Sequence, residues 1–360
     1  MRGYLAIKDV GLFSGEYYGC EGSFSGEVAY FRSRSFCWDV LTDPAYHKKI
    51  VITDRVNIEG SSSYPVLEQS LMPHLSAMVF LGQIKRDNRE SDRNGLRKYL
   101  STNRIGGFIP DRRDLLHDAL NFAGNCTAGI CDNPDRASDV ASKPVSYQPE
   151  DLKSISAPHE YLWDLVPGTI PAEQYNIVVW DFGTSYNLLK ILRENGCGIR
   201  VVPPDTHPED IVALRPDGIV ISGRPLSPEN AGKIIPRIER VVGIRPLLGI
   251  GGGAVTLAQA LGVKTYDLKT PHHGTAVAIE DTRSGTVSAT YQSHSICPDR
   301  ESLEKSNCEI THLNVCDDSV EGYFSDEYRA IGSLYTDIYK EKPHFLNDFH
   351  KLIGKSITTF

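Results

Sequence analysis

Short apolar runs alternate with amphipathic segments through the second half of the chain. Three of these runs have the length of buried strands, and a segment with helical spacing follows each of them. The strands are predicted at 175–181, 198–202 and 218–222, and the helices at 185–194, 208–214 and 228–242. Repeated strand–helix units of this length predict an open, mostly parallel sheet with helices on both faces. Its ligand site is expected at the carboxyl ends of the strands.

The same pattern reaches a cluster of glycines. An apolar run at 246–250 meets Gly251, Gly252 and Gly253, and a helix-forming segment then continues to Gly262. This order predicts a strand, a sharp turn and a helix. The first N–H groups of such a helix lack intrahelical partners and carry the positive end of the helix dipole, so an anion or a reacting oxygen is the expected guest.

The last part of the chain changes its period. Two alternating segments at 275–279 and 286–290 flank the turn signal at 283–285 and predict a hairpin, and a final helix is expected at 345–353. The fold class predicted for this half is therefore α/β.

The first part of the chain is predicted to form a mixed, β-rich unit. Strands are predicted at 26–31 and 49–53, and a helix at 112–120. Residues 137–174 are richer in Pro, Ser and Lys without sustained periodicity, which is typical of a connection between domains. We therefore expect a first domain at 1–136, a linker at 137–174 and a second domain at 175–360.

The composition of the chain argues against several classes of function. The formal net charge of −8 argues against binding to nucleic acid and to anionic membranes. Residues 1–9 lack the apolar core of a signal peptide and no later stretch is long and apolar enough to span a bilayer, so a cytoplasmic protein is expected. The eight cysteines form no CxxC pair and are interpreted as free thiols.

Two kinds of site place functional residues at a glycine-rich strand–helix junction. The dinucleotide fingerprint is matched in relaxed form by Gly249-x-Gly251-x-x-Ala254, with Asp267 at a plausible distance after the next strand. The nucleophile elbow instead needs an exposed Cys or Ser at the turn. The elbow position here is Gly251, which has no side chain.

The order of segments resembles the small, glutamine-hydrolysing subunit of carbamoyl phosphate synthetase over nearly the whole chain. In the first domain the resemblance lies in GEV at 26–28, LTDPAY at 41–46, KYL at 98–100 and DNPD at 132–135. In the second it lies in DFGTSYNLL at 181–189, RPDGI at 215–219, GI at 249–250, HHG at 272–274 and QSH at 292–294. The second set is shared with class I amidotransferases generally, which implies an amidotransferase-like second domain.

The resemblance implies a site that this chain no longer has. Glutamine hydrolysis in such a family uses a Cys thiolate on the elbow, a His as base, a Glu that orients the His, and backbone donors for the oxyanion. The family's Cys is replaced by Gly251, and an ungapped alignment puts Thr336 and Ile338 at the positions of the His and the Glu. We therefore expect a pseudoenzyme that does not hydrolyse glutamine.

Residues around the expected pocket have changed as well. Arg224 and Leu226 replace the two glycines of the family's oxyanion loop and would intrude on the glutamine volume. Of the family's glutamine contacts, Ser33 is the one that can be traced. Cys297 lies on no elbow and has no identified base, so it is interpreted as a packing residue and not as a relocated nucleophile.

Three functions follow as hypotheses. The first is a non-catalytic partner that stabilises or regulates an ATP-dependent ligase resembling the large subunit. The second is a repurposed pocket for a small anionic group, with carboxylate, carbamoyl or phosphoryl chemistry. The third, dinucleotide binding, depends on the fingerprint alone. No cofactor is implied by the first two, and no metal site is expected, because adjacent histidines on a strand point to opposite faces. Pocket candidates are Ser33, Arg224, Leu226, Gly251, Gly252, Gly253, His272, His273 and His294.

Overall fold

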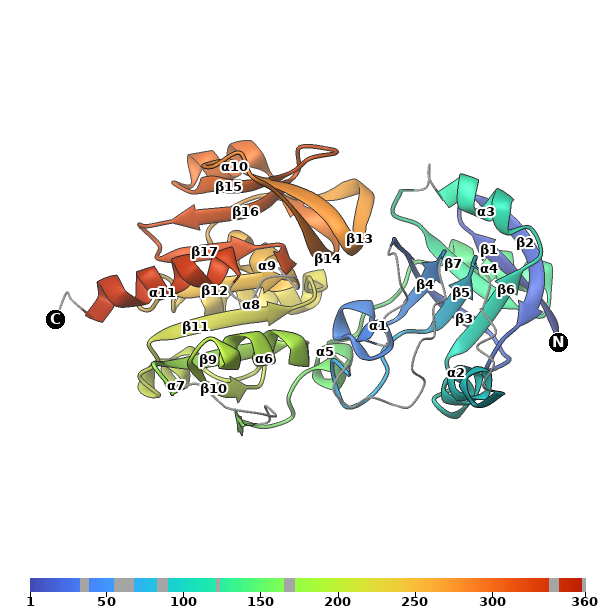
Figure 1. The fold of residues 1–360 in the computed structure, drawn as a ribbon, viewed down its shortest axis with the longest axis horizontal. Helices are drawn as coiled ribbons and strands as arrows, with labels where there is room; N and C mark the ends of the chain where they lie inside the picture. The colour runs from blue at the N-terminus through green and yellow to red at the C-terminus, as the bar shows by residue number, and fades with distance from the viewer. Residues whose placement is uncertain are drawn as a thin grey trace. The chain divides into compact units, whose positions relative to one another are not determined.

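The chain forms two compact units. The structure is a computed structural model that describes residues 1–32, 39–54, 68–82, 90–120, 124–164, 172–336 and 343–357. The first unit comprises Met1–Ser146 and the later segment Leu268–Thr275, and the second comprises Tyr147–Asp267 and Ala276–Phe360. The elements of both units can be followed along the chain in Figure 1. The compact units thus divide at 146, whereas we placed the end of the first domain at 136.

A closed seven-stranded barrel is the core of the first unit. Its strands are β1 (Arg2–Ile7), β2 (Gly11–Tyr17), β3 (Phe24–Phe31), β4 (Lys49–Thr53), β5 (Ala77–Phe80), β6 (Gly106–Pro110) and β7 (Thr127–Cys131). The order around the barrel is β1, β2, β6, β5, β4, β3 and β7. Ile50, Ile52 and Phe108 are fully buried among its core residues. The predicted β-rich character is confirmed, and the strands expected at 26–31 and 49–53 are β3 and β4.

Short helices accompany the barrel. Asn133 caps α4 by accepting a hydrogen bond from Arg136 N, and Pro134 occupies the first helical turn, where its missing N–H costs nothing. Ala137 and Ala141 of this helix pack against Ala6 and Cys131 of the barrel. The helices are α1 (Asp39–Thr42), a 3₁₀ turn (Pro44–Tyr46), α2 (Glu90–Thr102), α3 (Arg113–Leu120) and α4 (Pro134–Ser142), of which α3 confirms the helix predicted at 112–120.

The segment that we interpreted as a linker contains regular structure. Most of α4 lies in it, and so do α5 (Pro149–Ile155) and β8 (Tyr161–Trp163). β8 pairs antiparallel with Cys197–Val202 and extends the second unit's sheet at its edge. Of the prolines that suggested a loop, Pro149 stands at the first position of α5, where a missing N–H costs nothing.

A parallel sheet forms the centre of the second unit. Its strands are β10 (Cys197–Val202), β9 (Tyr175–Phe182), β11 (Gly218–Gly223), β12 (Leu247–Gly251) and β17 (Ala330–Ser333), in this spatial order. The connecting helices are α6 (Tyr186–Glu194), α7 (Pro208–Ala213), α8 (Pro228–Glu239) and α9 (Gly252–Ala260). Ser185 and Ser227 cap α6 and α8 through their hydroxyls. The α/β prediction is confirmed, and each of the four predicted strands is followed by its predicted helix.

Antiparallel strands extend this sheet beyond β17. They are β13 (Thr265–Asp281), β14 (Val287–Pro298), β15 (Glu309–Asn314), β16 (Val320–Ser325) and β18 (Tyr335–Thr336), with α10 (Arg300–Lys305) between β14 and β15. The sheet order continues from β12 as β17, β16, β15, β13, β14 and β18. The predicted hairpin corresponds to the end of β13 and the start of β14, and it is longer than we expected.

Helices cover both faces of the parallel strands. Leu188 and Leu192 of α6 and Phe349 of α11 (His344–Ile357) pack on one face, against Val179 and Val220. On the opposite face α9 lies against β12, since a Cβ placed on Gly249 would stand 2.7 Å from the Cα of Ala254. None of the described helices is long and apolar enough to cross a membrane.

Candidate functional site

The glycine junction has the backbone of a sharp strand–helix turn. β12 ends at Gly251, whose φ of +57° and ψ of −125° are strained for a residue with a side chain, and α9 begins at Gly252. β12 pairs in parallel with β11, so that Gly251 is opposite Gly223 at the carboxyl ends of the two strands. The predicted strand, turn and helix are therefore present at the expected edge of the sheet.

The position of Gly251 offers space but no reactive group. A Cβ built there would meet the carbonyl oxygen of Gly223 at 3.5 Å, which is an ordinary van der Waals contact. A side chain would therefore fit sterically, at the cost of a left-handed backbone conformation. The Cα of Gly251 carries only hydrogen in place of a side chain, so the turn supplies no nucleophile.

Gly252 and Gly253 are closed in by neighbouring backbone. A Cβ on Gly252 would stand 2.1 Å from the carbonyl carbon of Arg224, and one on Gly253 would stand 2.0 Å from the carbonyl oxygen of Ile221. Both residues are buried. The missing side chains of these two glycines let β11 and the loop after it approach the start of α9. The anion cradle that we expected from the N–H groups of the three glycines stays a prediction.

Arg224 and Leu226 lie on the loop between β11 and α8, as predicted. The guanidinium carbon of Arg224 is 3.9 Å from the ring centroid of Tyr147, in a cation–π contact. Leu226 and Arg224 share a narrow pocket with Tyr147, Asp151 and Leu152, and both are half-buried. Arg224 is thus held against an aromatic ring of its own unit.

His272 and His273 lie on β13, in the part of that strand that belongs to the first unit. Both are buried. The carbonyl oxygen of His273 accepts a hydrogen bond from Arg32 N at 3.1 Å, and its ring lies 5.8 Å from that of Tyr46. These contacts place His273 in the framework of the first unit.

The side chain of His294 is buried, although we expected it at a pocket rim. Its side chain on β14 is fully buried together with that of Glu321 on β16. His294 Nε2 lies 3.1 Å from Glu321 Oε2 and 3.2 Å from Gln292 Oε1, while Nδ1 lies 3.2 Å from the carbonyl oxygen of Ile296. Both ring nitrogens therefore have protein partners.

Glu321 is a partner that sequence reasoning missed. Its second oxygen, Oε1, accepts a hydrogen bond from Asn314 Nδ2 at 3.3 Å. Nothing in the local sequence links His294 to a carboxylate 27 residues later, because the pairing arises from the order of strands in the sheet. The arrangement resembles the base–orienter pair of a hydrolase in composition, but its burial assigns it to the core.

The other predicted site residues are Thr336, Ile338, Ser33 and Cys297. Thr336 is on β18 and pairs with Tyr291, while Ile338 and Ser33 lie outside the described residues. Cys297 is fully buried and its thiol donates to the carbonyl oxygen of Val320 at 2.8 Å. Burial raises the pKa of the Cys297 thiol far above its usual range, which agrees with a packing role.

The dinucleotide hypothesis is contradicted by the strand order. Asp267 is exposed near the start of β13. β17, β16 and β15 separate β13 from β12 in the sheet. In a dinucleotide fold the acidic residue follows the neighbouring parallel strand, where it can reach a ribose held at the glycine turn. Asp267 therefore cannot complete the fingerprint formed by Gly249, Gly251 and Ala254.

Comparison with known proteins agrees with this framework. The family model for class-I glutamine amidotransferases matches residues 178–333. The carbamoyl phosphate synthase small chain of Akkermansia muciniphila is 30% identical over 372 aligned residues, which cover 99% of this chain and 98% of that relative. The small chains of Neisseria meningitidis serogroup B and Aquifex aeolicus are 31% and 30% identical, with 88% of each chain covered. This chain therefore belongs to the carbamoyl phosphate synthase small chain family.

Proposed function

We propose that this chain is a family member that does not hydrolyse glutamine and acts as a structural or regulatory partner of an ATP-dependent ligase similar to the large subunit. The observation that carries the proposal is Gly251, a glycine at the apex of an intact strand–helix elbow. Amide hydrolysis of the amidotransferase type needs a nucleophile at this point that forms a covalent intermediate. Gly251 has no atom that can form that bond.

The other positions do not compensate for this loss. Thr336 has a hydroxyl of high pKa where an imidazole would take and return a proton. The buried His294 is held by Glu321 and Gln292, and the thiol of Cys297 is held protonated by burial. Removing the nucleophile or the base of a hydrolytic triad costs on the order of 10⁶ in turnover. We therefore expect no glutaminase activity at all.

The partner role is supported by what the chain retains. The curated relatives are named small chains of carbamoyl phosphate synthase, and the aligned region with the Akkermansia muciniphila relative includes the whole barrel unit. A chain that had lost only its hydrolytic site would keep its surfaces for a larger partner. Ammonia for such a ligase would then come from solution.

The test is to express the chain with a large-subunit-like ligase from the same genome. We expect the two to elute together in size-exclusion chromatography, and we expect ATP-dependent product formation with ammonium but not with glutamine. A glutamine-hydrolysing amidotransferase serves as the positive control for ammonia release. If glutamine supports the reaction as well as ammonium does, the non-catalytic assignment is wrong. If the proteins elute separately over a range of concentrations, the partner assignment is wrong.

A further inference from the structure

A polar cavity of about 300 Å³ lies in the second unit, away from the glycine turn. It is formed by the end of β13 and its following turn, by β15, and by the first two turns of α11. Asp281 is opposite His312 in the pairing of β13 with β15. Asn347, Asp348 and Lys351 share one face of α11, since residues three and four apart are neighbours on a helix. The volume is within the range of small-molecule sites.

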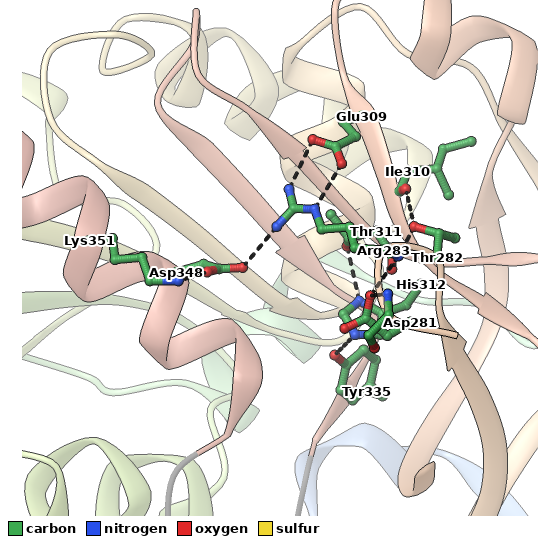
Figure 2. Close-up of polar contacts among 11 residues, drawn as sticks. Asp281, Thr282, Arg283, Glu309, Ile310, Thr311, His312, Tyr335, Asp348 and Lys351 are labelled. Atoms are coloured by element: carbon green, nitrogen blue, oxygen red, sulfur yellow. Dashed lines mark hydrogen bonds and ion pairs between the residues drawn. The ribbon is translucent and has the colours of Figure 1, made fainter. Parts of the chain in front are cut away.

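One wall of this cavity is formed by charged side chains that are paired with one another. The guanidinium of Arg283 donates two hydrogen bonds to Glu309, at 2.8 and 2.9 Å, and a third to Asp348 Oδ2 at 3.4 Å. Lys351 Nζ donates to Asp348 Oδ1 at 2.9 Å. Figure 2 shows Arg283 between Glu309 and Asp348, with Lys351 beyond Asp348 on the helix. Glu309 and Asp348 therefore already have cationic partners.

A second wall is fixed by neutral contacts. His312 Nε2 lies 3.1 Å from the hydroxyl of Tyr335, and Nδ1 lies 3.0 Å from Thr311 Oγ1. These two contacts, also visible in Figure 2, set the orientation of the imidazole ring beside Asp281. The wall is thus preorganised before any ligand enters, which lowers the entropy cost of binding.

Asp281 brings an available negative charge to the cavity. Its Oδ1 accepts hydrogen bonds from Arg283 N at 2.8 Å and Ser284 N at 3.2 Å, and the hydroxyl of Ser284 also lies within reach of the carboxylate. Burial alone would raise the pKa of Asp281, but the N–H groups of Arg283 and Ser284 outweigh it and lower the pKa. The carboxylate therefore stays ionised, and its two oxygens, with about four lone-pair sites between them, can accept a further donor.

The helix α11 contributes hydrogen-bond donors to the cavity. The side-chain amide of Asn347 makes no hydrogen bond within the part of the chain that the structure describes, and it lines the cavity. Lys351 uses one of its three ammonium protons on Asp348 and is largely exposed. Asn347 and Lys351 are four residues apart, so both can reach one guest from the same side.

The charges around the cavity select the ligand class. The lining carboxylates Asp281 and Asp348 are matched by the lining cations Arg283 and Lys351, so the cavity has no excess of positive charge that would favour a simple anion. A divalent cation would find only Asp281, because both oxygens of Asp348 already accept hydrogen bonds. A guest with an ammonium for Asp281 and a carboxylate for Lys351 and Asn347 satisfies every available group. We propose that this cavity binds a free amino acid, with its ammonium on Asp281 and its carboxylate on Asn347 and Lys351.

The ligand specificity can be tested by calorimetry on the full chain. The proteinogenic amino acids are screened by thermal shift, and those that raise the melting temperature are titrated. N-acetylation of the bound amino acid removes the ammonium, and the corresponding amine lacks the carboxylate. We expect both changes to weaken binding about tenfold or more, because each leaves one end of the cavity unpaired. Equal binding of the N-acetyl compound, or no binding by any amino acid at about 10 mM, would overturn the proposal.

Two variants locate the site. Asp281→Asn keeps an oxygen for the turn N–H groups and should fold, yet it loses the charge that holds the ammonium. Asn347→Ala removes the side-chain amide that would donate to the carboxylate. We expect each to raise the dissociation constant at least about tenfold. Glu301→Gln, an exposed carboxylate on α10 paired with Lys305, is the matched control and should bind like the wild type. Unchanged affinity in both cavity variants would refute the assignment, whatever the outcome of the ligase experiment.

Discussion

Gly253→Ala tests whether the glycines at the start of α9 serve close packing or ligand binding. A Cβ at Gly253 would lie 2.0 Å from the carbonyl oxygen of Ile221, whereas ordinary van der Waals contact begins at 3.4 Å. The helix would have to move away from β11 by about 1.4 Å to relieve the contact. Both elements belong to the core of the sheet, so the displacement disturbs their packing.

The expected magnitude follows from two opposing effects. Overpacking a core typically costs about 1–3 kcal/mol, while replacing a helical glycine by alanine gains about 0.5–1 kcal/mol. Gly232 of α8 isolates the second effect, since a Cβ there would meet no atom within 4 Å. We expect Gly232→Ala to raise the free energy of unfolding by about 0.5–1 kcal/mol and Gly253→Ala to lower it by about 1–2 kcal/mol.

Denaturation with urea, followed by tryptophan fluorescence, measures this difference. Trp163 and Trp180 are buried in the second unit, and a common Trp38→Phe background removes the third tryptophan from the signal. The midpoints should shift in opposite directions with unchanged slopes. If Gly253→Ala is as stable as Gly232→Ala, the space beside Gly253 is open and the packing argument is wrong.

Three further predictions concern other parts of the chain. Glu321→Ala leaves His294 and Asn314 without their buried partner, so we expect a loss of about 3–5 kcal/mol in urea denaturation; a loss below about 1 kcal/mol would mean that the pair is not buried as described. Burial, with a smaller contribution from His47, lowers the pKa of His74 from 6.5 to about 4. The unfolded chain therefore binds the extra proton first, and stability should fall by about 2 kcal/mol as the pH drops from 6.5 toward 4, a slope that His74→Gln should remove. Gly251→Cys should cost about 1–2 kcal/mol through its positive φ and should release no ammonia from glutamine; measurable hydrolysis would show that another residue acts as the base.

The α/β half of the fold could be predicted because buried parallel strands have a simple sequence signal. The strands at 175–181 and 218–222 are continuous apolar runs, and the helices that follow them begin at the capping residues Ser185 and Ser227. The antiparallel strands β15 and β16 have no such signal. These strands are short and contain polar residues that pair inside the sheet, such as Asn314 and Glu321, so a residue-by-residue pattern does not identify them.

The candidate site was predicted in position but not in environment. The sequence placed Gly251 at the edge of the sheet correctly, because a strand, a glycine turn and a helix are local features. Whether His294 faces a pocket or the core depends on which strands lie beside β14, and that order is set by contacts far apart in sequence. The cavity at Asp281 was missed for the same reason, since it joins a hairpin turn to a helix more than 60 residues later.

The glycine turn shows that the backbone conformation of an elbow can be separated from the nucleophile that it would carry. A nucleophile at position 251 would need a side chain in a left-handed conformation, whose strain of about 1–3 kcal/mol the rest of the fold must offset. Gly251 adopts the same backbone without that strain, so losing the nucleophile does not weaken the turn. Gly252 and Gly253 are different, because their small size is what lets α9 approach β11. The strand, turn and helix of the elbow are therefore kept in this chain with a glycine at the apex.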